Sequence, residues 1–147
     1  PETSRARADA EMRAAIHRKL AEDRANYSVL RSLQNEITEA SRMFWSGAYR
    51  DAVAALKRVA ERAHDTPNGQ SIECEALRMA GHGLIRLCSF EAAGQCLDSC
   101  MALACSIRGG ISLHANAHIA LGQLASAKEP PDHQAAQQHH GYARTLA

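Results

Sequence analysis

The chain has 147 residues, the length of about one domain. Hydrophobic residues make up 46% and charged residues 22%, a composition that argues against wholesale disorder and against a membrane bundle. The formal net charge is only +1, so no long-range field favours nucleic acid or an anionic membrane as a partner. Alanine contributes 29 residues and aromatic residues only 4%. Because an alanine-rich core needs closely spaced backbones, the composition predicts packed helices rather than a sheet.

Helical patterns follow one another along the chain, and no segment alternates with the period of a strand. Residues 4–24 and 26–46 both have a helical pattern, and the first of them is heavily charged. After Gly47, apolar residues between Ala48 and His64 recur at intervals of three and four. Further helices are expected at 71–87, 90–107, 111–127 and 132–147, separated by Pro67-Asn68-Gly69, Ser89, Gly109-Gly110 and Pro130-Pro131. The sequence therefore predicts about seven helices, six of which form three consecutive pairs.

Small residues recur at intervals of 41 to 43 along these pairs. One column consists of Ala40, Gly81 and Gly122, a second of Ala52, Ala93 and Ala136, and a third of Ala63, Ala104 and Ala147. Glycine inside a helix costs roughly 1 kcal/mol relative to alanine. Gly81 and Gly122 therefore indicate positions where two helices cross closely and a large residue of the partner helix fills the space.

These columns resemble the tetratricopeptide repeat, in the long form found in scaffolds of the Pins/LGN type. Leu77, Gly81 and Leu84 match its first-helix signature, whereas Phe90, Ala93, Leu97 and Cys100 match its second-helix positions. In the third unit His140 stands where the family usually has Leu or Phe.

The resemblance implies an all-α, right-handed stack of antiparallel helical hairpins that spans residues 1–147 as one domain. Residues 1–25 would be an N-terminal helix, half of an upstream repeat, and the repeats would occupy 26–66, 67–108 and 109–147. The chain would then be a fragment of a longer protein.

The resemblance also places the first helix of each pair on a concave face that binds partners. Arg78, His82 and Arg86 follow one another at intervals of four, a row suited to the carboxylates of an acidic peptide. A merely solvated face is the equal alternative for this row. The other residues expected on the face are Glu75, Gln34, Ser41, Trp45, Asn116 and Gln123, with Phe44 and Ile119 beside them. For Trp45, a place in the core against helix 4–24 is favoured over a role as an interface anchor.

The histidines and cysteines predict neither a metal site nor catalysis. His114 and His118 share one helical face, but Ala115 stands where a zinc protease would have Glu, and no acidic or thiolate ligand has a helpful spacing. The five cysteines form no CxxC pair, which indicates reduced thiols in a cytoplasmic protein. Cys100 shares its repeat position with Val59 and Ala143, so we expect it to serve as a small buried apolar group.

The function expected from these observations is that of a non-catalytic scaffold without a cofactor, whose concave groove binds a peptide or helix of a partner protein. The partner segment would be acidic. The alternative is an oligomerisation or regulatory segment of a larger protein that assembles through its terminal helices.

Overall fold

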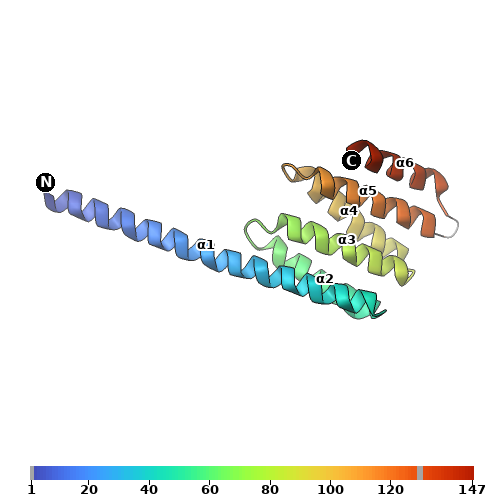
Figure 1. Ribbon diagram of the computed structural model, residues 1–147, viewed down its shortest axis with the longest axis horizontal. Helices are drawn as coiled ribbons and strands as arrows, with labels where there is room; N and C mark the ends of the chain where they lie inside the picture. Colours follow the sequence, from blue (N-terminus) through green and yellow to red (C-terminus); the bar gives the residue numbers. More distant parts are fainter. Residues whose placement is uncertain (1, 129–130) are drawn as a thin grey trace.

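The computed structural model describes residues 2–128 and 131–147, and within them the chain is built from helices alone. The helices in chain order are α1 (Glu2–Trp45), α2 (Tyr49–His64), α3 (Gln70–Arg86), α4 (Phe90–Ser106), α5 (Ile111–Ala127) and α6 (His133–Leu146) (Figure 1). The all-α stack of antiparallel hairpins is thus confirmed.

The N-terminal half of the chain forms one helix where the sequence pattern predicted two. No Gly or Pro occurs between Pro1 and Gly47, so nothing interrupts the backbone between the segments 4–24 and 26–46. The first break is Gly47, whose φ of +88° is readily adopted only without a side chain. The helix count within the described residues is therefore six rather than seven.

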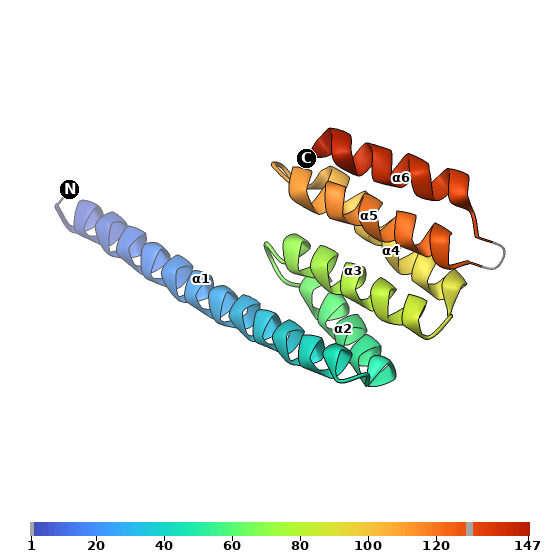
Figure 2. The ribbon, with the colours of Figure 1, turned by 45° about the vertical axis from the view of Figure 1, so that its right-hand side comes forward.

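The helices form two layers that differ in how closely their members approach. Each helix contacts the next one in the chain, and α3 also contacts both α1 and α5. Among the described residues, α2, α4 and α6 make no such contact with one another. The layer of α1, α3 and α5 is therefore the tighter one, and closer spacing on this side makes it the concave side of the stack. Figure 2 shows α3 and α5 in front of α4.

Gly81 and Gly122 lie where helices cross, as predicted, whereas Ala147 of the third column is exposed and follows the end of α6. A Cβ added to Gly81 would stand 2.5 Å from Cδ2 of Leu97, and one added to Gly122 would stand 2.9 Å from Cε1 of His140. His140 therefore fills in the α5–α6 pair the space that Leu97 fills in the α3–α4 pair.

Two helix ends show the repeat in backbone detail. The N–H of Ala48 donates to the carbonyl of Met43, and the N–H of Ser89 donates to the carbonyl of Leu84, both at 2.9 Å. Each bond closes a helix C-terminus of the type in which the residue just before the N–H donor adopts a left-handed backbone conformation. That residue is Gly47 after α1 and Cys88, with φ +58°, after α3.

The last interruption expected between helices is Pro130-Pro131, of which Pro130 lies outside the described residues. Asp132 caps α6, because its Oδ1 accepts a hydrogen bond from the N–H of Ala135 at 3.0 Å. This cap makes α6 begin at His133, one residue later than predicted.

The cysteines lie in the core more often than on the surface. Cys100 is buried, as are Val59 and Ala143 at the same repeat position, which confirms that this position takes a small apolar group. Cys74 of α3 meets Cys100 across the helix pair, with 3.3 Å between the two sulfur atoms. This contact and burial raise the pKa of Cys100, so the thiol is a poor nucleophile. Within the described residues, no helix combines the length and apolar character needed to cross a bilayer.

Candidate partner-binding groove

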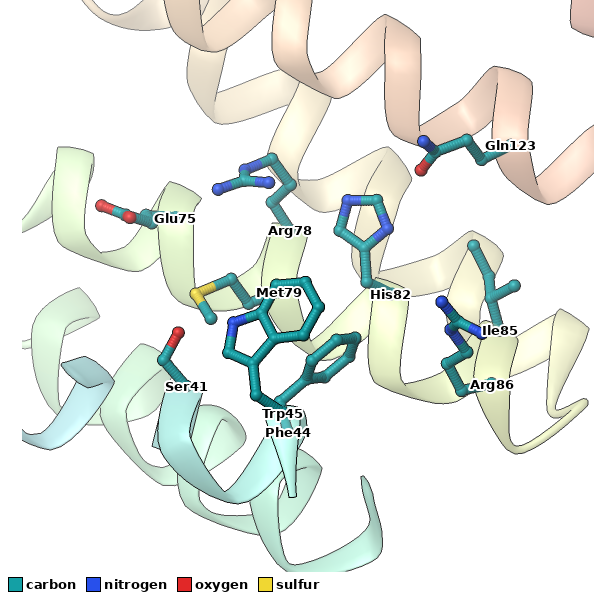
Figure 3. A pocket seen from close by; sticks show the side chains of 10 residues that line it. All are labelled: Ser41, Phe44, Trp45, Glu75, Arg78, Met79, His82, Ile85, Arg86 and Gln123. Atoms are coloured by element: carbon teal, nitrogen blue, oxygen red, sulfur yellow. The ribbon is translucent and has the colours of Figure 1, made fainter. Parts of the chain in front are cut away.

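A groove with a volume of about 610 Å³ opens on the concave side, between α1, α3 and α5. It is lined by Ser41, Phe44, Trp45, Glu75, Arg78, Met79, His82, Ile85, Arg86 and Gln123 (Figure 3). One wall is aromatic and comes from the end of α1. The facing wall is a charged row on α3, and Gln123 of α5 borders it.

Seven of the nine residues expected on the concave face line this groove, namely Ser41, Trp45, Glu75, Arg78, His82, Arg86 and Gln123. The other two lie elsewhere. Gln34 is exposed on α1, two turns before Ser41. Asn116 lines a separate hollow between α5 and α6, together with Ile119. The groove therefore covers less of the concave face than the sequence analysis predicted.

Met79 and Ile85 also line the groove, and the sequence analysis did not assign them to it. Both side chains are half-buried. Met79 precedes His82 by three residues and Ile85 follows it by three, so helical spacing alone could have found them.

The expectation that Trp45 fills the core is wrong. Its side chain is 80% exposed, because α1 is continuous and residues 4–24 extend away from Trp45 instead of folding back over it. The ring stands edge-on to Phe44, with 5.4 Å between the ring centroids. Phe44 in turn packs edge-on against Tyr49 at 5.2 Å. The exposed indole is thus held by an aromatic support that is anchored in the stack.

The α3 row carries its positive charge on either side of His82. Burial, together with the charges of Arg78 and Arg86, lowers the pKa of His82, so the imidazole is neutral at pH 7. Among the described residues, neither Arg78 nor Arg86 takes part in an ion pair. Both guanidinium groups are therefore free to receive carboxylates, whereas Glu75 makes the N-terminal end of the row acidic.

A second group of ionisable side chains joins α5 to α6. The Nδ1 atoms of His118 and His139 lie 2.9 Å apart, and the rings of His114 and His118 are 4.8 Å apart. Burial lowers the pKa of both His118 and His139, which keeps them neutral and able to share a hydrogen bond. No group of three or more His, Cys, Asp or Glu in residues 2–128 and 131–147 is arranged to hold a metal ion.

Comparisons with known protein families, with curated proteins and with solved structures found no match to this chain. The groove must therefore be interpreted from its own chemistry.

Proposed function

We propose that this chain is a non-catalytic interaction scaffold of tetratricopeptide type, whose groove binds an acidic segment of a partner protein. The observation that carries this proposal is the pairing of two unlike walls: free guanidinium groups of Arg78 and Arg86 face the exposed indole of Trp45 across one groove.

Each wall supports a different part of the recognition. Guanidinium groups bind carboxylates through paired, charge-assisted hydrogen bonds. An exposed Trp on a rigid support is the kind of residue that anchors protein interfaces, because it buries a large area at little entropic cost. A ligand that satisfies both walls combines carboxylates with at least one large apolar side chain.

Selection of random 12-residue peptides displayed on phage tests the proposal. Peptides selected on the wild-type protein should be rich in Asp and Glu and contain a large apolar residue. For these peptides, Arg78→Glu with Arg86→Glu should weaken binding by more than about tenfold, since each charge-assisted hydrogen bond to a carboxylate contributes about 1.5–3 kcal/mol. Fluorescence anisotropy of a labelled selected peptide measures the affinity.

Arg50→Glu with Arg58→Glu provides the matched control. These two exposed arginines have the same spacing of eight residues but lie on α2, in the outer layer. The control variant should bind like the wild type, and both variants should keep their helical circular dichroism. Retained binding in the Arg78→Glu, Arg86→Glu variant would place the site elsewhere.

Assembly through the terminal helices is the second candidate function. Its supporting observation is that α1 exposes Met12, Ile16 and Leu20 on its projecting half. Sedimentation at micromolar concentration tests this candidate, because a monomer would contradict self-assembly through the terminal helices.

A further inference from the structure

The N-terminal half of α1 projects from the stack without any cover from the rest of the chain (Figure 1). Every residue from Thr3 to Ala25 is exposed. Three large hydrophobic side chains stand on this part of the helix, Met12, Ile16 and Leu20, and Tyr27 follows directly after it; each of the four is 47% to 66% exposed. We call this set the α1 stripe. An exposed row of this kind marks an interaction surface.

The α1 stripe lies on the same side of the helix as the groove wall. Its members are separated by steps of four, four and seven residues, which keep to one helical face. Further steps of seven, seven and four lead from Tyr27 to Gln34, Ser41 and Trp45. Ser41 and Trp45 line the groove, so the stripe and the groove form one continuous surface.

The charges beside the α1 stripe identify the class of partner. Arg13, Arg24 and Arg31 lie within one turn of the stripe residues, and none of them is in an ion pair among the described residues. Lys19 and Asp23 neutralise each other at 3.1 Å. Asp9 is the acidic residue on this face, three residues before Met12. The three arginines outnumber it, so the border of the stripe is basic overall.

A second copy of the chain fits this border poorly. If two α1 helices paired through their stripes, the arginines of one copy would lie against basic borders of the other, and like charges at such spacing destabilise a helix pair. An acidic partner meets the same arginines favourably. The groove shows the same preference through Arg78 and Arg86, which lie at the far end of the same surface.

We propose that the α1 stripe docks an acidic amphipathic helix of a partner protein, and that this helix leads the partner into the groove. Its apolar residues pack on Met12, Ile16, Leu20 and Tyr27, and its carboxylates meet Arg13, Arg24 and Arg31. From Met12 to Trp45 the surface is roughly 50 Å long, at a rise of about 1.5 Å per residue. The continuation into the groove rests on the proposed function, whereas docking on the stripe does not.

Two labelled synthetic helices of about 28 residues, enough to span the projecting half of α1, test this proposal. Both carry Leu at helical intervals of three and four, flanked by Glu in one peptide and by Lys in the other. The Glu peptide should bind the wild-type protein, and the Lys peptide should bind at least about tenfold more weakly. Fluorescence anisotropy at low and high salt measures both affinities.

Ile16→Glu with Leu20→Glu should weaken binding of the Glu peptide by at least about tenfold. Ala14→Glu with Ala21→Glu is the matched control, because it adds two carboxylates to the opposite side of the same exposed helix. The control variant should lose much less affinity than the stripe variant. Circular dichroism checks that both variants remain helical.

Three results would overturn the proposal: no binding of the Glu peptide by the wild type, an equal drop in affinity in both variants, or tighter binding of the Lys peptide. A wild-type dimer in sedimentation that Ile16→Glu with Leu20→Glu converts to a monomer would overturn it too, by making a second copy the occupant. Failure of the groove is distinguished by the phage-selected 12-residue peptide, whose binding depends on Arg78 and Arg86 and is unaffected by the stripe variant.

Discussion

At the scale of single residues, some helical glycines of this chain lie against a neighbouring side chain that leaves no room for a Cβ atom, and others have open space there. Gly81 lies under Leu97, and an added Cβ would come within 2.5 Å of that side chain. Gly141 lies inside α6 with nothing within 4 Å of such an atom. Both positions are helical, so helix propensity is the same in the two cases and only packing differs.

Gly81→Ala should therefore destabilise the protein, while Gly141→Ala should stabilise it. Alanine favours a helix by about 1 kcal/mol at either site. At Gly81 the overpacking against Leu97 costs about 1–3 kcal/mol and exceeds this gain. Urea denaturation followed by circular dichroism measures both changes. Stabilisation by Gly81→Ala would mean that the α3–α4 crossing is looser than the structure shows.

His82 makes binding in the groove sensitive to pH. Its pKa lies below the ordinary value of 6.5 because of burial and the charges of Arg78 and Arg86, and bound carboxylates would raise it again. The complex therefore takes up a proton, and the affinity for an acidic peptide should rise as pH falls from about 7.5 to about 5.5. The His82→Gln variant should lose this dependence, which anisotropy titrations at several pH values would reveal. An unchanged dependence in the variant would assign the titration to another group.

Stability changes with the opposite sign at His82. Its unfolded-state pKa is the higher one, so acidification below about 6.5 protonates the unfolded chain first and lowers the free energy of unfolding. As pH falls, the affinity for the peptide should therefore rise while the free energy of unfolding falls. Because the two quantities change in opposite directions, they can be told apart experimentally.

Much of the residue-scale pattern could be predicted because spacing determines it. The columns of small residues needed only the repeat interval of 41 to 43 residues, and the Arg78–His82–Arg86 row needed only the helical period. Trp45 was misplaced because residues 4–24 were expected to form a separate helix that covers it. Asn116 was misplaced because its side of α5 faces a separate hollow rather than the groove.

At the scale of elements, the boundaries of α2 to α6 could be predicted closely because turn residues mark them. The interval 111–127 coincides with α5, and the interval 90–107 differs from α4 by one residue. The continuity of α1 was missed although the sequence indicates it, because no Gly or Pro separates the segment 4–24 from the segment 26–46.

Deletion of residues 1–24 should leave the stability of the stack nearly unchanged, within about 0.5 kcal/mol, because the described side chains removed are all exposed. Deletion of residues 1–36 is the informative contrast. It also removes the fully buried Leu33, and its removal should cost about 2–5 kcal/mol. Urea denaturation of both truncated chains measures the difference. A large destabilisation by the shorter deletion would show that the projecting half supports the stack.

At the scale of the whole molecule, each helix contacts its neighbours in the chain, and within the described residues longer-range support comes only through α3. Stacks of this kind approach one-dimensional cooperativity, in which a terminal pair can unfold while the remainder stays folded. The α5–α6 pair is such a terminal unit. Leu124 of α5 is 3% exposed and contributes to the contact between this pair and the other helices. Its Cδ2 lies 3.6 Å from a Cβ added to Gly94 of α4.

Leu124→Ala should therefore release the terminal pair rather than the whole domain. The cavity costs about 2–5 kcal/mol, and amide hydrogen exchange should accelerate in α5 and α6 while α2 and α3 keep their protection. Leu97→Ala is the contrasting variant, because Leu97 is fully buried at the central crossing with Gly81 and its truncation should accelerate exchange in every helix that packs in the stack. If Leu124→Ala accelerated exchange equally from α2 to α6, the stack would be a single cooperative unit, and the terminal pair could not open separately when a partner binds.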